Sequence, residues 1–86
     1  MTKAYSINQA GIYAIQSWID ANLDKNPRVF DLWANGIASE IDRDIHLDDD
    51  LNRNGEFTFE LTGYRDAQGH IMRIGLELSH FDEVTT

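Results

Sequence analysis

The chain has 86 residues, no cysteine and a formal net charge of −8 at neutral pH. This length fits a single domain, which we expect to span residues 1–86. The lack of cysteine excludes disulfide bonds and thiolate metal sites, and no apolar run in the sequence is long enough to cross a membrane. The N-terminal stretch does not have the pattern of a signal peptide, so we expect a cytoplasmic protein.

The negative charge is confined to the second half of the chain. Residues 1–39 contain three basic and three acidic residues, whereas residues 40–86 contain twelve acidic residues and four arginines. A field of this sign repels nucleic acids and membranes and attracts basic surfaces. Eight of the acids, which we name the acidic band, are Glu40, Asp42, Asp44, Asp48, Asp49, Asp50, Glu56 and Glu60.

Residues 7–23 are predicted to form the first helix. Ser6 and Gln9 have the spacing of a capping box, in which each side chain accepts a hydrogen bond from the backbone N–H of the other residue. Apolar residues then recur at helical spacing at Ile12, Ile15, Ile19 and Leu23. Gly11 costs this helix about 1 kcal/mol relative to alanine, which suggests that it permits close packing.

Residues 27–43 are predicted to form a second helix. Asparagine caps helices and proline is favoured at the first helical position, and Asn26 and Pro27 stand in that order. The apolar stripe of this helix is Phe30, Trp33, Ile37 and Ile41. The Asn35–Gly36 pair leaves open whether the helix kinks or ends there. Because few residues separate the two helices, we expect a helical hairpin.

The spacing of apolar residues changes from near four to two after residue 45. Apolar and polar residues alternate over 56–62 and again over 72–79, which predicts two strands. The intervening Asp66 and Gly69 fit the ends of a type I turn closed by a left-handed glycine. We therefore predict an antiparallel hairpin.

Short segments on either side of these elements are candidates for further strands. Lys3 to Tyr5 and Ile45 to Leu47 can each add an edge strand, since an isolated two-stranded ribbon is marginal in water. The last residues, from Asp82 to Thr86, are expected to be frayed.

The order of elements predicts an α+β fold, in which an N-terminal two-helix hairpin packs on a small C-terminal antiparallel β-sheet. Trp18 and Phe30 match the apolar stripes, whereas Tyr5, Tyr13, Tyr64 and Phe81 lie off them. Tyr64, beside Arg65, is either an interface anchor or, as we favour, a surface residue without a role. The expected core contains Ile15, Ile19, Trp33, Ile37, Phe57, Phe59, Ile74 and Leu76.

The segment from Asp50 to Phe57 resembles the opening of a calcium-binding loop of the EF-hand type. The resemblance implies Asp50, Asn52 and Asn54 as ligands, with the backbone carbonyl of Glu56 as another. The twelfth position of such a loop supplies a bidentate glutamate, but here it is Leu61. We therefore expect a simple turn before a strand, without a micromolar calcium site.

The sequence contains no motif for catalysis. Its serines lack a glycine-flanked elbow, and its six glycines are too scattered for a phosphate-binding loop. Asp42 and Asp44 stand two residues apart and point to different sides of a helix, so their simplest role is solvation. His46, His70 and His80 lack metal-ligand spacing. We expect no enzymatic activity, no cofactor and no metal.

A very small, cysteine-free, acidic α+β chain without catalytic motifs resembles the small phage-borne inhibitors, namely anti-CRISPR proteins and DNA-mimic anti-restriction proteins. The resemblance covers the whole chain through size, charge and lack of chemistry, because these groups share no motif. It implies that carboxylates take the place of phosphates in a nucleic-acid channel lined by lysine and arginine. It also implies action in the cytoplasm of a host bacterium.

We therefore expect a non-enzymatic inhibitor that binds a basic nucleic-acid-handling protein, such as a CRISPR effector complex, through the acidic band. Asp42 and Asp44 favour this function, because carboxylates near a helix C-terminus are electrostatically unfavourable and suggest selection for something other than stability. Direct binding of nucleic acid or membranes is not expected. Three alternatives stay open: a protein–protein interaction or structural module, which includes a homodimer through a sheet edge; a calcium-binding module; and charge that serves solubility alone.

Overall fold

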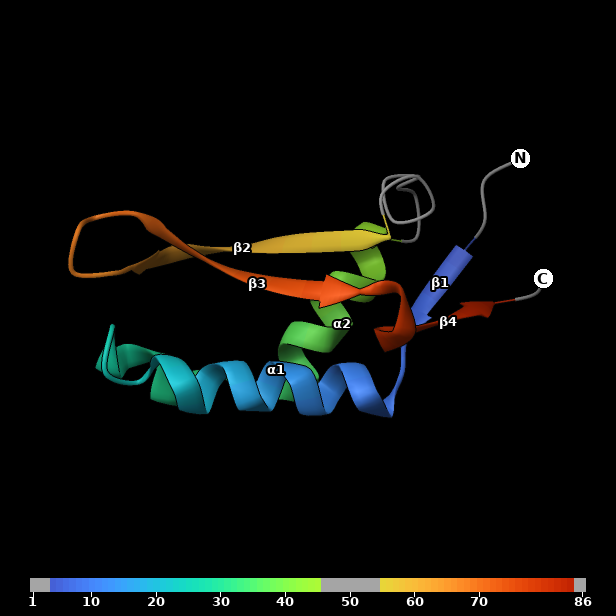
Figure 1. Ribbon diagram of the computed structural model, residues 1–86, viewed down its shortest axis with the longest axis horizontal. Coiled ribbons are helices and arrows are strands. Elements are labelled where there is room, and N and C mark those ends of the chain that lie inside the picture. The colour runs from blue at the N-terminus through green and yellow to red at the C-terminus, as the bar shows by residue number, and fades with distance from the viewer. Residues whose placement is uncertain (1–3, 46–54, 85–86) are drawn as a thin grey trace.

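The computed structural model describes residues 4–45 and 55–84. Their elements are β1 (Ala4–Ile7), α1 (Gln9–Asn22), the 3-10 helix η1 (Pro27–Asp31), α2 (Ala34–Ile45), β2 (Glu56–Arg65), β3 (Ile71–Glu77), the 3-10 turn η2 (Leu78–His80) and β4 (Phe81–Val84). The fold is α+β, as predicted. In Figure 1, α1 and the β2–β3 hairpin form the two long sides of the molecule, and the β1–β4 ribbon lies at one end, near both termini.

The strands form two antiparallel sheets of two strands each. β2 pairs with β3, which confirms the predicted hairpin. β1 pairs with β4 in a register that joins Ala4 to Val84 and Ile7 to Phe81. The expected strand near Tyr5 is thus present, but the expectation that it adds an edge to the hairpin is wrong, because it pairs with β4 in a separate sheet. The expectation that the chain is frayed from Asp82 is wrong for residues 82–84, because β1 gives this segment a hydrogen-bonding partner.

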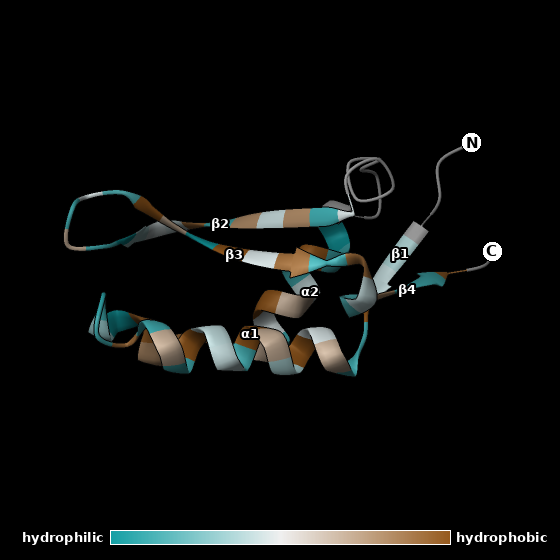
Figure 2. Ribbon diagram, viewed as in Figure 1, coloured by the Kyte–Doolittle hydropathy of each residue, from teal (hydrophilic) through white to brown (hydrophobic). Residues whose placement is uncertain are grey.

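The first helix begins at Gln9, two residues later than predicted, because residues 4–7 belong to β1. Asn8 is the cap: its Oδ1 accepts a hydrogen bond of 3.0 Å from the backbone N–H of Gly11. The predicted capping box at Ser6 is therefore wrong. Figure 2 shows both apolar and polar residues along α1, and its buried residues Gly11, Ile15 and Ile19 recur at helical spacing.

The predicted single helix over residues 27–43 is wrong, because the chain breaks at Leu32. Asn26 caps η1 as expected, since its Oδ1 accepts a hydrogen bond of 3.0 Å from Arg28 N. Leu32 then has an extended backbone, with φ −75° and ψ 140°. α2 follows and continues to Ile45, so the candidate strand that starts at Ile45 is also wrong there. Residues 46–47 lie outside the described residues.

This break changes which aromatic side chains face the core. Val29 is fully buried, whereas Phe30 is 77% exposed and Trp33 is 69% exposed. Both aromatics were expected in the core, and both predictions are wrong. A 3-10 helix has three residues per turn, and the extended Leu32 interrupts the helical backbone. Residues spaced for a single α-helix, such as Phe30 and Trp33, therefore do not share a buried face with Ile37 and Ile41.

The hairpin turn has the predicted geometry. Gly69 has a φ of +85°, and its N–H donates to Asp66 O at 3.0 Å. The register between the strands is regular from Glu56 to Glu60 and then shifts before Arg65. β3 ends at Glu77 rather than residue 79, because η2 turns the chain toward β4.

The core lies between the helices and the inner faces of the sheets. Six of the eight expected core residues are buried, Phe59 is half-buried and Trp33 is exposed. Two further aromatics, Tyr5 and Phe81, are buried although they lie off the predicted stripes. Phe81 packs edge-on against Phe57 with ring centroids 6.2 Å apart, which joins the two sheets.

Gly11 is a site of close packing, as predicted. A methyl group added at Gly11 would lie 2.6 Å from the backbone oxygen of His80 and would also meet the side chain of Ile7. The absence of a side chain therefore lets the start of α1 approach η2 and β1, and Asn8 N donates to the same oxygen of His80 at 2.9 Å.

Candidate interaction surface

Three members of the acidic band are exposed side chains: Glu40 on α2, and Glu56 and Glu60 on β2. Asp44 belongs to the last turn of α2. Asp48, Asp49 and Asp50 lie outside the described residues, as does most of the calcium-like segment. Its one described glycine, Gly55, has a φ of +71°, which fits the expected turn before the strand.

Asp42 does not belong to the exposed set. Its Oδ1 accepts a hydrogen bond of 2.7 Å from the backbone N–H of Ile7, and its Oδ2 accepts one of 3.3 Å from Ser6 Oγ. Its side chain is half-buried between α2 and β1. The interpretation of Asp42 as a merely solvated residue is therefore wrong, because this carboxylate holds the edge of β1 that faces away from β4. Its predicted contact with a partner stays a prediction.

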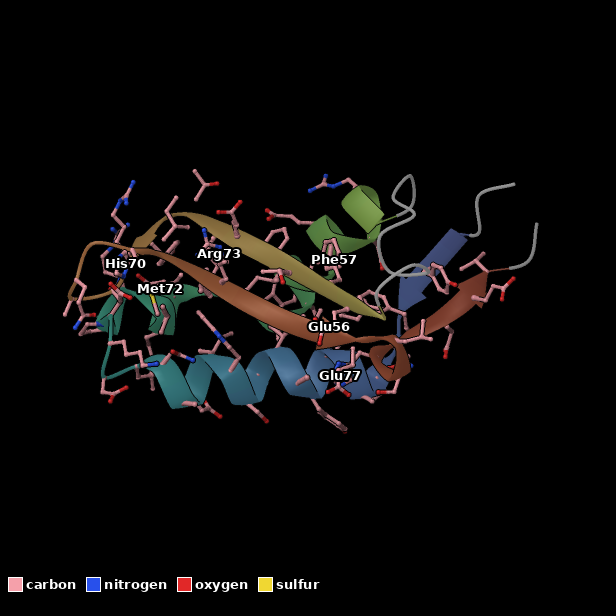
Figure 3. The ribbon with its side chains drawn as sticks, turned by 45° about the horizontal axis from the view of Figure 1, so that its top comes forward. Glu56, Phe57, His70, Met72, Arg73 and Glu77 are labelled. Atoms are coloured by element: carbon pink, nitrogen blue, oxygen red, sulfur yellow. The ribbon has the colours of Figure 1, made fainter. Side chains whose placement is uncertain are left out.

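The outer face of the hairpin presents the two exposed glutamates of β2. Glu60 Oε2 accepts a hydrogen bond of 3.2 Å from Arg73 Nη2 across the hairpin, in an ion pair whose side chains are both 55% exposed. Glu56 stands opposite Glu77 in the register, at the end of the hairpin away from its turn (Figure 3). Like charges in such positions are mildly destabilising, and they concentrate negative charge at this end of the hairpin.

A groove of about 640 Å³ lies between β2 and the segment that runs from the end of η1 along α2 to Arg43. Its apolar lining includes Leu32, Trp33, Ile37 and Phe59, and its charged lining is Asp31, Glu40, Arg43 and Glu60. Three carboxylates and one guanidinium leave an excess of two negative charges. The groove brings together two members of the acidic band, Glu40 and Glu60, from elements that are separate in the sequence.

Trp33 forms an exposed aromatic wall of this groove. Its carbonyl accepts the first α-helical hydrogen bond of α2, 3.0 Å from Ile37 N, so the side chain stands at the helix start. A methyl group added at Gly36 would lie 3.3 Å from Trp33 Cε3. The indole therefore lies close to the bare backbone of Gly36 while most of its surface stays exposed. The apolar spacing did not predict this position, because the break at Leu32 decides it.

Tyr64 also lines the groove, and Arg28 of η1 packs against its ring. The guanidinium carbon of Arg28 lies 5.1 Å from the centroid of the Tyr64 ring. Arg28 Nη1 also donates to Gly63 O at 3.5 Å, and Asn26 Nδ2 donates to Arg65 O at 3.0 Å. Tyr64 is half-buried against the core, so the expectation of a surface residue without a role is wrong.

The turn of the hairpin contains the one carboxyl group with a displaced pKa among the described residues. Asp66 Oδ1 accepts hydrogen bonds from the backbone N–H groups of His70, at 3.0 Å, and Gln68, at 2.9 Å. These bonds, with that from His70 the larger cause, hold the pKa of Asp66 below its usual value. They stabilise the turn, and nothing in this arrangement suggests catalysis.

The described histidines have local roles. His80 Nδ1 accepts a hydrogen bond of 3.0 Å from the backbone N–H of Glu77, within η2. His70 is exposed at the hairpin turn, with Nδ1 3.8 Å from Asp66 Oδ2. Within residues 4–45 and 55–84, no three histidine or acidic side chains are grouped so that they could hold a metal ion.

No helix in the described part of the chain is both long and apolar enough to cross a bilayer. No protein-family model matches the chain, and neither a curated protein nor a solved structure shows significant similarity to it.

Proposed function

We propose that this protein is a non-enzymatic inhibitor that binds a basic, nucleic-acid-handling protein, such as a CRISPR effector complex, through its acidic surface. The observation that carries the proposal is the segregation of charge, because the whole net charge of −8 falls in residues 40–86. A channel that holds nucleic acid is positively charged, and a surface of the opposite sign is steered to it at fast, salt-sensitive rates.

The exposed carboxylates of two neighbouring elements support this proposal. Glu40 on α2 and Glu60 on β2 line one groove, and Glu56 lies on the same outer face of β2 as Glu60. Along a strand, the Cα atoms of Glu56 and Glu60 are separated by about 13 Å. Asp42 is left out of the proposed contact set because its carboxylate is held by β1. Asp31 and Glu77 are added to the contact set.

The competing function is an interaction module that recognises its partner through apolar contacts. Phe30, Trp33 and Tyr13 favour it, since these aromatic side chains are 77%, 69% and 66% exposed and aromatics are enriched at interfaces. The two functions differ in their response to salt. Electrostatic recognition weakens as ionic strength rises, whereas apolar recognition does not.

The proposal is tested by capturing a partner from a bacterial lysate on the immobilised protein and measuring the association rate of the purified pair at low and raised salt. The variant Glu40→Gln/Glu56→Gln should associate about two- to several-fold more slowly at low salt, with a flatter salt dependence. The control Asp20→Asn/Asp24→Asn makes the same charge change at exposed positions on or just after α1, and it should behave as the parent.

Two results would contradict the proposal. An association rate that does not change with salt would support the apolar interaction module. Equal slowing by both double variants would mean that total charge matters and the acidic surface does not.

Action on a nucleic-acid-handling system would place the protein in the cytoplasm of the bacterial host.

A further inference from the structure

The groove between α2 and β2 combines features that fit a specific kind of side chain. It contains an exposed indole, at Trp33, and carboxylates from both walls, at Glu40 and Glu60. Trp33 immediately precedes α2, and its spacing from Gly36 and Glu40 places all three along one side of the helix. An aromatic face with carboxylates beside it is complementary to an organic cation.

The groove is open along β2. Among the described residues, β2 pairs with β3 alone, and the groove is lined by residues of β2 and none of β3. Its volume of about 640 Å³ is within the range of ligand-binding clefts, roughly 300–1,000 Å³. It therefore has room for an extended segment of chain rather than for one side chain alone.

We propose that this groove receives an arginine side chain from an extended basic segment of the partner protein, with its guanidinium against the Trp33 indole and beside the Glu40 carboxylate. Arginine fits better than lysine, because the planar guanidinium stacks on aromatic rings and donates two parallel hydrogen bonds to a carboxylate. Glu60 already accepts a hydrogen bond from Arg73, so Glu40 is the main acceptor. This inference rests on the proposed function and names where its partner is held.

The excess negative charge of the groove favours a basic occupant. Its charged lining carries three carboxylates against the single guanidinium of Arg43, and the protein as a whole carries a net charge of −8. A second copy of this chain would bring another excess of negative charge to the groove, so self-association there is disfavoured.

The test is a nuclear magnetic resonance titration of the whole protein with an acetylated peptide of alternating arginine and serine. The control peptides replace arginine by citrulline, which is neutral with nearly the same shape, or by lysine. The arginine peptide should shift the indole N–H signal of Trp33 and the backbone amides of Phe59 to Thr62. The citrulline peptide should leave them in place, and the lysine peptide should bind more weakly.

Substitutions then separate the groove from the general acidic surface. Trp33→Ala and Glu40→Gln should each weaken binding of the arginine peptide about two- to five-fold, as expected for the loss of one cation–π contact or one exposed ion pair. The matched controls are Tyr13→Ala, a similarly exposed aromatic on α1, and Asp24→Asn, an exposed carboxylate just after α1 that lies outside both the groove and the proposed contact set. Both controls should bind as the parent does.

The outcomes distinguish this inference from the proposed function. If Glu56→Gln, a change on the acidic surface outside the groove, weakens binding as much as Glu40→Gln while Trp33→Ala has no effect, the groove proposal is wrong, but the basic partner stands. If the citrulline or lysine peptide binds as well as the arginine peptide, arginine recognition is wrong. The proposed function itself is tested with the captured partner and not with these peptides. Trp33 and Glu40 are exposed, so both variants should fold, and their amide spectra verify this.

Discussion

The carboxylate of Asp42 in α2 accepts a hydrogen bond of 2.7 Å from the backbone N–H of Ile7 in β1, 35 residues away in the sequence. A carboxylate near a helix C-terminus is electrostatically unfavourable, and this contact gives Asp42 a structural reason to be there. The acceptor satisfies a backbone group on the side of β1 that is not paired with β4. The position of Asp42 therefore stabilises the fold and gives no support to a binding role.

Replacing Asp42 by alanine should lower the free energy of unfolding by about 1–3 kcal/mol, because Ile7 N–H then lacks its acceptor in a partly buried place. Asp42→Asn keeps an acceptor oxygen and should lose less. Urea unfolding followed by circular dichroism measures both. The control is Glu40→Ala, an exposed position on the same helix, which should stay within about 0.5 kcal/mol of the parent. An equal loss in the two alanine variants would show that the Asp42 contact adds nothing.

Replacing Gly11 by alanine sets helix propensity against packing. Propensity alone predicts a gain of about 1 kcal/mol, whereas the added methyl group would lie 2.6 Å from His80 O. Because that neighbour is backbone and cannot rotate away, we expect a net loss of about 1–3 kcal/mol. Thermal unfolding measures it, with Ser17→Ala at an exposed position of α1 as a control that should be neutral or slightly stabilising. A raised melting temperature for Gly11→Ala would contradict the packing.

Asp66 should make the hairpin turn sensitive to acid. The backbone hydrogen bonds from His70 and Gln68 lower the pKa of Asp66 in the folded protein. A lowered folded-state pKa gives stability that is fully present above the unfolded value, about 3.9, and is lost as pH falls through the folded value. Asp66→Asn should therefore lose less stability than the parent between about pH 5 and pH 2.

The measurement for Asp66 is urea unfolding at several acidic pH values. Asp20→Asn is the control, since Asp20 is an exposed carboxylate on α1. It should follow the parent's pH dependence. If Asp66→Asn follows it as well, the hydrogen bonds to Asp66 do not contribute to stability.

The elements with a long, regular apolar period are those that the sequence predicts well. Most of α1 and the β2–β3 hairpin follow from their own spacing and from the turn residues Asp66 and Gly69. The β1–β4 ribbon was predicted only in part, because two strands of four residues at opposite ends of the chain leave no periodic signal. Their pairing depends on tertiary contacts.

The candidate site was harder to predict than the fold. Its charge is visible in the sequence, but its geometry depends on the extended conformation of Leu32. That single residue turns Trp33 from an expected core residue into the wall of a groove and places Asp31 beside it. Asp42 is the reverse case, because it was expected to be exposed and is half-buried. Its carboxylate accepts a hydrogen bond from β1, a strand that the apolar pattern indicated only weakly.

Competition between this protein and nucleic acid for the captured partner tests the central claim most directly. The purified partner is bound to its labelled guide RNA or DNA, and the protein is added at low salt while release of the label is followed. Mimicry predicts release, which the Glu40→Gln/Glu56→Gln variant achieves only at a concentration about two- to several-fold higher. If the partner holds its nucleic acid and this protein at the same time, and the variant binds as fast as the parent, the acidic surface does not mimic nucleic acid.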